Sequence, residues 1–212
     1  MDADFWRARW REGRLGWHRA DVNPLLARHL PALGLAPGAR IFMPLCGKSR
    51  DIHWLLGEGF CVAGCELVET AVEQLFEELG VAPTIEDRGR LKLYRAEGVD
   101  IVVGDIFDLD AETLGRVEAV YDRAALVALP PETRKRYAAH VAAATACAPQ
   151  ILVTYVYDQS LIGGPPFSVT DEEVRALYAG AYDVTLLESA DVEGGMKGRC
   201  PAIEHALALR HC

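Results

Sequence analysis

Glu66 stands at a position that suits the recognition of a ribose. It ends an apolar stretch, Phe60 to Cys65, and lies 19 residues after Gly47, which belongs to the turn behind an earlier apolar stretch. In folds that bind nucleotides, an acid about 20 residues beyond the first turn accepts hydrogen bonds from ribose hydroxyls. A carboxylate suits this role because it can accept two hydroxyl protons at once. A solvated acid at the end of a strand is the alternative.

The first turn, Leu45-Cys46-Gly47-Lys48-Ser49, indicates which nucleoside ligand to expect. A phosphate loop needs a glycine five residues before Gly47, where Phe42 stands, and a dinucleotide fingerprint needs three spaced glycines, of which only Gly47 is present. A nucleoside triphosphatase and a dehydrogenase are therefore disfavoured. The pattern favours a cofactor with a ribose and an adenine but no phosphate, and S-adenosylmethionine meets that description.

Asp105 and Ile106 follow an apolar stretch that ends at Val103, with Phe107 next in the chain. We expect Asp105 to flank the adenine of the cofactor, with Ile106 or Phe107 packing on its ring. A turn or helix-cap role for Asp105 is the alternative.

Arg123 follows another apolar stretch and comes directly after Asp122. A guanidinium is a fixed cation with several donors. It can hold an anionic substrate, or favour the ionised form of a thiol by lowering its pKa. A structural ion pair with Asp122 is the alternative.

The first 20 residues carry three of the four tryptophans, Trp6, Trp10 and Trp17, among five arginines. Phe5, Trp6 and Trp10 fall on one face of a predicted helix. Such a stripe can pack in a core. Placed before the first strand, it can also fold over the ligand cleft, exclude water and contact a sulfonium through its rings.

Strand-like and helix-like stretches alternate from Arg40 onward. Apolar and β-branched runs predict strands, and amphipathic runs with caps predict helices. Thr70-x-x-Glu73 and Thr170-x-x-Glu173 are predicted capping boxes that open two helices. The predicted strands are 41–45, 60–65, 91–95, 99–103, 117–121, 151–157, 183–187 and 204–210, and the predicted helices are 25–33, 49–56, 70–79, 131–147 and 170–179.

This alternation predicts an α/β fold with a Rossmann-like, mostly parallel sheet and helices on both faces. We expect one domain over residues 1–212, in which residues 1–34 form an N-terminal helical cap over the cofactor cleft. Ligands of such sheets bind outside the carboxyl ends of the strands. Leu45, Glu66, Asp105 and Arg123 all fall at those predicted ends.

Composition narrows the class of partner. The chain has 22 basic and 31 acidic residues and a net charge of −9, so neither nucleic acid nor an anionic membrane is an expected partner. No apolar run reaches the roughly 18 residues of a membrane-spanning helix. The six cysteines are scattered without a C-x-x-C pair, so we expect no metal site and no disulfide framework. A cytoplasmic protein is the resulting expectation.

Taken together, these stretches resemble the bacterial form of the thiopurine S-methyltransferase family over nearly the whole chain. The resemblance rests on Phe5-Trp6-Arg7-Ala8-Arg9-Trp10, Pro44-Leu45-Cys46-Gly47-Lys48-Ser49, Gly64-Cys65-Glu66, Gly104-Asp105-Ile106-Phe107, the stretch from Tyr121 to Pro130, and Gly164-Pro165-Pro166-Phe167. The proline-leucine-cysteine-glycine-lysine turn and the aspartate-arginine-alanine-alanine stretch at 122–125 are its most specific motifs.

The resemblance implies a seven-stranded class I methyltransferase sheet, parallel except for one strand. It implies that Trp10, Leu45, Glu66 and Arg123 contact S-adenosylmethionine, with Trp6 and Trp17 as candidate lid residues. It also implies methyl transfer to the sulfur of aromatic and heterocyclic thiols such as thiopurines, or to selenium or tellurium compounds, by a monomer that releases S-adenosylhomocysteine. Arg123 is then the candidate catalytic residue.

The segment from Val192 to Pro201 departs from the family pattern, which has a more strongly charged stretch with an arginine there. Lys197 or Arg199 is a candidate replacement. Because this departure bears on the substrate, a non-catalytic domain of the same fold that binds S-adenosylmethionine or another protein is the alternative function.

Overall fold

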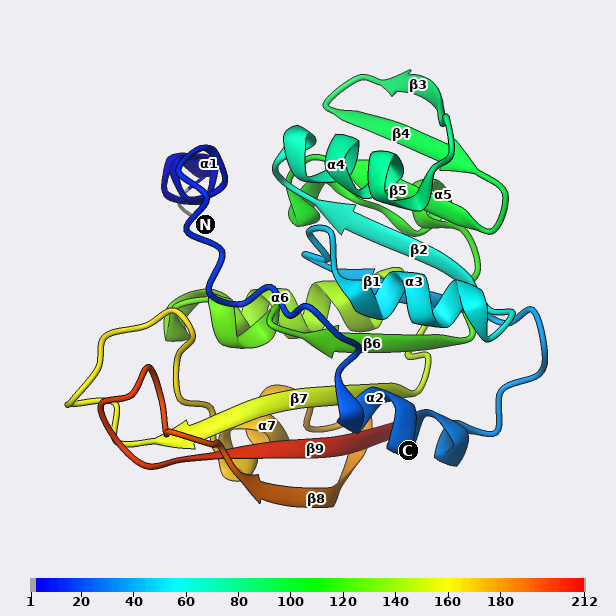
Figure 1. The fold of residues 1–212 in the computed structure, drawn as a ribbon. Helices are drawn as coiled ribbons and strands as arrows, with labels where there is room; N and C mark the ends of the chain where they lie inside the picture. The colour runs from blue at the N-terminus through cyan, green and yellow to red at the C-terminus, as the bar shows by residue number, and fades with distance from the viewer. Residues whose placement is uncertain (1–2, 212) are drawn as a thin grey trace.

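A nine-stranded sheet forms the centre of the computed structural model, which describes residues 3–211 (Figure 1). The strands lie in the order β3-β4-β5-β2-β1-β6-β7-β9-β8. Their bounds are β1 Arg40–Pro44, β2 Cys61–Glu66, β3 Thr84–Arg88, β4 Leu91–Ala96, β5 Val99–Val103, β6 Ala119–Arg123, β7 Gln150–Tyr157, β8 Tyr182–Asp191 and β9 Ala202–His211.

Five neighbouring strands, β5, β2, β1, β6 and β7, run parallel to one another. The final strand, β9, inserts antiparallel between β7 and β8. These seven strands form the predicted Rossmann-like sheet with one reversed strand. The described sheet has nine strands instead of seven, because the antiparallel hairpin of β3 and β4 extends it beyond β5.

Helices cover both faces of the sheet, as the sequence predicts. Along β1, Ile41 and Met43 join one buried cluster with residues of α2, α3 and α4, while Phe42 joins a second cluster with residues of α5, α6 and α7. The central strands are therefore buried on both sides. The helices are α1 Ala3–Arg11, α2 Pro24–His29, α3 Arg50–Gly57, α4 Glu69–Leu79, α5 Ala111–Leu114, α6 Pro131–Ala144 and α7 Asp171–Leu177, with short 3₁₀ turns η1 Leu30–Leu33, η2 Ile106–Asp108 and η3 Leu126–Ala128.

Strand β3 is absent from the elements that the sequence predicts. Its residues, Thr-Ile-Glu-Asp-Arg, are exposed or half-buried, and Ile85 is 57% exposed. An edge strand that faces solvent on both sides lacks the alternation of apolar and polar residues on which such a prediction depends.

Strand β6 lies two residues further along the chain than the prediction of 117–121, so Asp122 and Arg123 are its last residues rather than part of the following turn. The buried Asp122 carboxylate is satisfied inside the protein. Its Oδ1 accepts from the Leu126 amide at 3.0 Å, and its Oδ2 accepts from the Tyr137 hydroxyl at 2.7 Å. These partners let a strand end with an acid in the core.

Helix α4 begins at Glu69 without a side-chain cap, so the predicted capping box at Thr70 and Glu73 is wrong. Glu66 instead accepts a hydrogen bond from the Val68 amide, just before the helix. The predicted cap at Thr170 is confirmed, because the Thr170 side chain accepts from the Glu173 amide, but the Glu173 carboxylate pairs with Arg134 instead of completing the box.

The segment expected to form the N-terminal cap has two parts. Helix α1 stands away from the sheet (Figure 1), and its Trp10 packs with Val68 and Ala71 near the start of α4. Helix α2 lies against the sheet, where Leu25 and Leu26 join the buried cluster. Between the two parts, the amide of buried Asn23 donates to Asp51 Oδ1 at 2.7 Å and ties the chain to α3.

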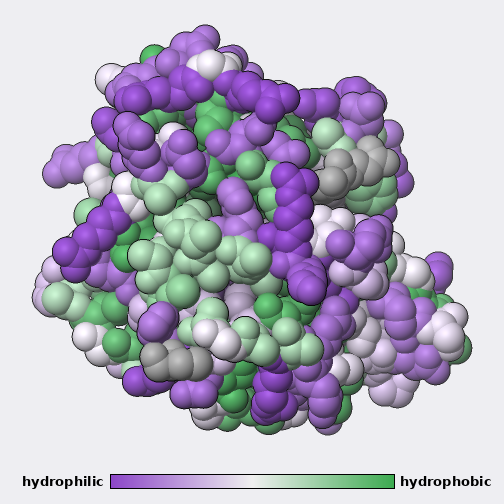
Figure 2. Space-filling model, turned by 180° about the vertical axis from the view of Figure 1, so that it is seen from behind, coloured by the Kyte–Doolittle hydropathy of each residue, from purple (hydrophilic) through white to green (hydrophobic). Residues whose placement is uncertain are grey.

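The outer surface is mainly polar on the face seen from behind, where apolar areas lie between the charged and polar side chains (Figure 2). Within residues 3–211, no helix combines the length and the apolar character needed to cross a membrane.

We predict that Tyr137→Phe destabilises the fold in a pH-dependent way. Burial raises the pKa of Asp122 to about 6, and the hydrogen bond from Tyr137 partly offsets this rise. A carboxyl group whose pKa is raised in the folded state loses stabilisation as the pH rises through that pKa. The variant should therefore lose about 1.5–3 kcal/mol near pH 8, where Asp122 is ionised, and about 1 kcal/mol near pH 5.

Urea unfolding at the two pH values measures both losses. Tyr178→Phe is the matched control, because its hydroxyl is also buried but has no hydrogen-bond partner among the described residues. Its stability should change little at either pH. Two results would contradict a stabilising hydrogen bond between Tyr137 and Asp122. One is an equal loss of unfolding free energy in the two variants, and the other is a loss in Tyr137→Phe that does not grow with pH.

Candidate active site

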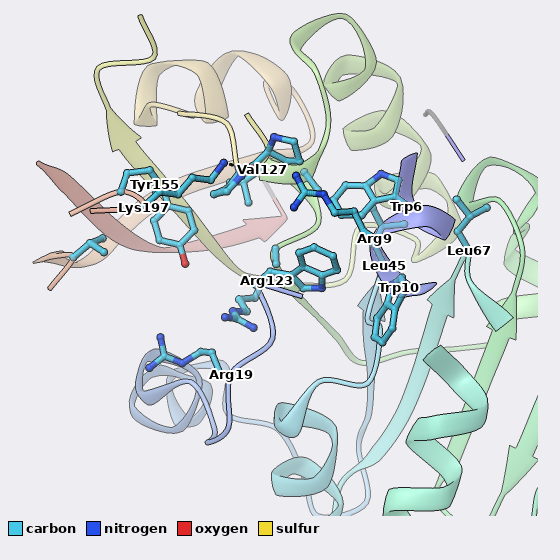
Figure 3. Close-up of a pocket in the computed structure, with 18 of the residues that line it drawn as sticks. Trp6, Arg9, Trp10, Arg19, Leu45, Leu67, Arg123, Val127, Tyr155 and Lys197 are labelled. Atoms are coloured by element: carbon cyan, nitrogen blue, oxygen red, sulfur yellow. Dashed lines mark hydrogen bonds between the residues drawn. The ribbon is translucent and has the colours of Figure 1, made fainter. Parts of the chain in front are cut away.

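A cavity of about 350 Å³ opens at the carboxyl ends of β1, β2 and β6. Figure 3 shows Trp6, Arg9 and Trp10 of α1 on one side, Tyr155 and Lys197 on the opposite side, and Arg123 between them. Its volume is in the range of small-molecule sites. The lining consists of Trp6, Arg9, Trp10, Gly16, Trp17, Arg19, Leu45, Glu66, Leu67, Arg123, Ala124, Val127, Ala128, Tyr155, Pro165, Pro166, Val192, Gly195, Met196 and Lys197.

The turn after β1 brings the backbone close to Trp10 and Glu66. Gly47 has a φ of +52°, and a Cβ built on it would lie 3.0 Å from Cζ2 of Trp10. The Cys46 amide donates to the Cys65 carbonyl at 3.1 Å, which joins the turn to the end of β2. The turn therefore needs only one glycine, Gly47, to come close to the Trp10 ring and the Glu66 carboxylate. A loop that wraps a phosphate needs several.

Glu66 is 6% exposed and holds two backbone segments. Its Oε2 accepts from the Gly47 amide at 2.8 Å, and its Oε1 accepts from the Val68 amide at 2.8 Å. Burial raises the pKa of this carboxyl group, while the two amide donors lower it. Each oxygen has a second lone pair beyond its amide bond, so the carboxylate can still accept from a ligand hydroxyl.

Left-handed backbone conformations gather around the cavity. Leu45 with φ +48°, Ala124 with φ +61° and Lys197 with φ +51° all line it. Residues with a Cβ rarely adopt this region, and such strain persists only where the surrounding structure holds it in place. The three constrained positions lie in the turn after β1, the turn after β6 and the loop before β9, and all three form part of the cavity wall.

The aromatic side of the cavity is built by three tryptophans. Trp6 and Trp17 meet edge to face with centroids 5.2 Å apart, and Trp10 and Trp17 do so at 6.2 Å. Trp10 is 8% exposed, whereas Trp6 and Trp17 are half-buried. The tryptophans therefore pack on one another, and they also present rings to the cavity. Their contact with a ligand stays a prediction.

Four cationic side chains line the same cavity: Arg9, Arg19, Arg123 and Lys197. The alternative of an ion pair between Arg123 and Asp122 does not hold, because Asp122 bonds to Leu126 and Tyr137. The Nε atom of Arg123 is buried and has no hydrogen-bond partner in the described part of the chain. Arg123 is thus available to a ligand.

The chain's own nucleophiles near the cavity are held in their protonated forms. Burial, then nearby Glu66, raises the pKa values of the Cys46 and Cys65 thiols well above normal. Burial and then Glu204 raise the pKa of Tyr155 to about 12, and its hydroxyl donates to Glu204 Oε1 at 2.9 Å. None of these groups competes as an anion with an incoming substrate.

The structure brings four of the predicted site residues together: Trp10, Leu45, Glu66 and Arg123 all line the cavity. Asp105 and Ile106 do not line it. Asp105 caps η2 by accepting from the Phe107 amide at 3.0 Å, and Ile106 is 1% exposed within the core. Asp105 nevertheless lies beside Glu66, because the Gly104 amide donates to the Glu66 carbonyl at 2.9 Å.

Among the lining residues with charged or hydroxyl-bearing side chains, Arg9, Arg19 and Tyr155 are not among the predicted site residues. The arginine-rich start of the chain signals the first two, but only the fold shows which arginines face the cavity. Tyr155 lies inside β7 and carries no sequence signal. His18 and Lys48 line a small adjoining pocket, where burial and then Lys48 lower the pKa of His18.

The same folding pattern occurs in known methyltransferases. The 1,6-didemethyltoxoflavin-N1-methyltransferase of Burkholderia thailandensis, crystallised with S-adenosylhomocysteine, superposes with a TM-score of 0.67 at 20% identity over 98% of this chain and 87% of that chain. A S-adenosylmethionine-dependent methyltransferase of Anabaena variabilis gives a TM-score of 0.69 at 15% identity over 99% and 95%. At these identities the likeness establishes the fold, and the predicted fold class is confirmed.

Sequence comparison gives the family. The thiopurine S-methyltransferase family model matches residues 1–205. The thiopurine S-methyltransferase of Xanthobacter autotrophicus is 55% identical over 210 residues, which are 99% of each chain, and that of Gluconobacter oxydans is 51% identical over 96% of this chain and 93% of its own. With the cavity and its lining in place, these matches confirm the resemblance, and the chain belongs to the thiopurine S-methyltransferase family.

Proposed function

We propose that this protein transfers a methyl group from S-adenosylmethionine to the sulfur of aromatic or heterocyclic thiols, thiopurines among them. The observation that carries the proposal is the joint lining of one cavity by Glu66, Arg123 and the α1 tryptophans. These groups supply an acceptor for a ribose, a cation for a thiolate and aromatic faces for a sulfonium. Selenium and tellurium nucleophiles fit the same chemistry, and we propose them as further acceptors.

S-adenosylmethionine is the cofactor of this family, and the chain has the fold of S-adenosylmethionine-dependent methyltransferases. When bound, it supplies an electrophilic methyl carbon: a thiolate forms the new carbon–sulfur bond while the sulfonium takes the electron pair of the broken bond and becomes the thioether of S-adenosylhomocysteine. The residues present fit this group, because the cavity offers an acceptor carboxylate and a glycine-poor turn without a phosphate cradle.

The proposed binding assigns one part of the cofactor to each element. The lone pairs of Glu66 that its amide partners leave open accept from the ribose hydroxyls, and Leu45 covers the sugar from the turn after β1. Trp10 closes the other side of the cavity. Asp105 would flank the adenine from the end of β5, and this part of the proposal rests on the proximity of Gly104 to Glu66, whereas Ile106 is buried in the core.

Arg123 is proposed to act on the methyl acceptor. A heterocyclic thiol is partly ionised near neutral pH, so the reaction needs a stabilised anion rather than a strong base. A guanidinium beside the sulfur favours the thiolate. The closed aromatic side excludes water, and alignment of the two reactants supplies most of the rate gain.

Incubation of the protein with labelled S-adenosylmethionine and a set of thiols, selenols and tellurium anions tests the activity directly. Mass spectrometry should detect the methylated acceptor and an equal amount of S-adenosylhomocysteine. Cofactor binding without methylation of any acceptor would favour the alternative of a non-catalytic binding domain.

We predict that Glu66→Gln weakens the binding of S-adenosylhomocysteine. The amide loses the negative charge and places an NH₂ donor against a backbone N–H, so the dissociation constant should rise by about 10- to 100-fold. Isothermal titration calorimetry measures this change. Glu69→Gln is the matched control, since Glu69 accepts from Lys92 and Tyr94 outside the cavity and should bind as the wild type does. An unchanged constant for Glu66→Gln would remove the ribose role.

We predict that Arg123→Met shifts the pH dependence of turnover. With saturating cofactor and an aromatic thiol, kcat reports the ionisation of the bound thiol. Loss of the cation should move the acidic limb upward by about one pH unit, so the variant loses about tenfold more activity near pH 6 than near pH 9. If kcat of the variant falls by the same factor at every pH, Arg123 instead positions the acceptor and does not stabilise its thiolate.

A further inference from the structure

Arg9 and Lys197 bring two positive charges into one cavity from opposite sides. They come from α1 and from the loop before β9, segments far apart in sequence. Figure 3 shows the Lys197 side chain extending across the cavity toward the side where Arg9 lies. Burial lowers the pKa of Lys197, and the charged groups that lower it further are Arg9 and Arg199. The two cations therefore repel each other in the described protein.

No acid of residues 3–211 forms an ion pair with Arg9 or Lys197 within 4.0 Å. The Nε atom of Arg9 is buried without a hydrogen-bond partner, and its guanidinium lies 5.0 Å from the centre of the Phe5 ring. Lys197 donates to the Pro165 carbonyl at 2.8 Å. Arg9 thus contacts an aromatic ring and Lys197 a backbone carbonyl, and neither contact supplies a negative charge.

Arg123 and Arg19 also form no ion pair within residues 3–211, but both lower the pKa of Tyr155, whose hydroxyl donates to Glu204 Oε1 at 2.9 Å. Glu66, the acid that lines the cavity, lies at the end of β2 and is engaged with the amides of Gly47 and Val68. Arg9 and Lys197 differ from the other two cations in their mutual repulsion, which no acid of residues 3–211 compensates by an ion pair.

The reactants of the proposed methyl transfer do not supply that missing charge. S-adenosylmethionine carries a sulfonium, an ammonium and a carboxylate, so it adds net positive charge to the cavity. The acceptor thiolate is offset by the sulfonium, and both charges disappear when the methyl group moves. An anion that pairs with Arg9 and Lys197 and still leaves the cofactor's carboxylate beside its own ammonium is a separate group on the acceptor.

The loop that carries Lys197 is built to hold it. The Met196 amide donates to the Cys200 carbonyl at 2.8 Å, and Met196 and Cys200 are buried together with Tyr157 and Ile162. A Cβ at Gly195 would lie 2.2 Å from the Cys200 carbonyl oxygen. Lys197 itself has the left-handed backbone of a constrained turn. Its place in the cavity wall is therefore fixed rather than incidental.

We infer that the methyl acceptor carries a carboxylate, or an oxyanion of similar size, in addition to its reacting sulfur, and that Arg9 and Lys197 bind this second anionic group. The inference rests on the proposed function and names the substrate class of the same cavity: anionic aromatic or heterocyclic thiols. Arg9 and Lys197 are then residues that determine specificity, while Arg123 faces the reacting sulfur.

The test compares 6-mercaptonicotinate with 6-mercaptonicotinamide, which differ in the carboxylate alone. The measured quantity is the ratio of their kcat/KM values, because a general loss of activity cancels in it. The wild type should prefer the carboxylate by about tenfold or more, mainly through KM, and the preference should fall as salt is added. Arg9→Gln and Lys197→Met should each remove most of it.

Arg11→Gln is the matched control, since Arg11 lies on the same helix and does not line the cavity. It should keep the wild-type ratio. A wild-type ratio near one, or an equal fall of the ratio in Arg9→Gln and Arg11→Gln, would overturn the inference while leaving methyl transfer in place.

A binding measurement separates the inference from the proposed function. The methylated compounds, 6-(methylthio)nicotinate and its amide, are titrated by calorimetry into protein saturated with S-adenosylhomocysteine. Tighter binding of the carboxylate, lost in Arg9→Gln and Lys197→Met, supports the anionic subsite even if no thiol is methylated, in which case the proposed function fails alone. Equal binding of the two compounds overturns the subsite whatever the turnover.

Discussion

The carboxylate of Glu66 is the interaction on which the geometry of the site depends. It accepts from the Gly47 amide on one side and from the Val68 amide on the other, so the turn after β1 and the start of α4 are fixed to the end of β2. Burying this charge is costly, and the two amide donors are the compensation that the fold provides. Trp10 packs on both segments, through Gly47 and Val68, so the position of α1 also follows from this carboxylate.

The cavity and the whole chain carry charge of opposite sign. The chain carries a net charge of −9, yet the cavity lining sets four cations against the single acid Glu66. Beyond about 8–10 Å, salt screens the field of the cavity, so attraction acts on small anions that enter it. A polyanion such as nucleic acid would meet the acidic exterior first. This charge distribution is the reason why we propose a small anion as a ligand and expect no nucleic acid as a partner.

Much of the fold follows from local patterns, whereas the site depends on contacts between distant segments. The buried strands carry enough apolar residues to be predicted, but β3 has an exposed polar sequence. The end of β6 is concealed by two charged residues, Asp122, whose partners come from η3 and α6, and Arg123. Glu66 and Arg123 are predictable because charged residues at strand ends face the ligand edge of a parallel sheet. Arg9 and Tyr155 are not, since a regular helix and a regular strand give no sign of which side chain meets the cavity.

Protonation state decides which nucleophile reacts in such a cavity. A sulfonium methyl group is reactive toward any thiolate, and Cys46 and Cys65 lie in the first turn and at the end of β2. Burial and the nearby Glu66 charge raise the pKa of both thiols, so they stay protonated beside the same carboxylate that is proposed to hold the ribose. Tyr155 is protected in the same way by burial and Glu204. Arg123, with its unpartnered Nε, gives the opposite environment to a sulfur that arrives from outside. The same cavity thus keeps the chain's own thiols protonated and holds Arg123, the group that we propose activates the sulfur of the acceptor.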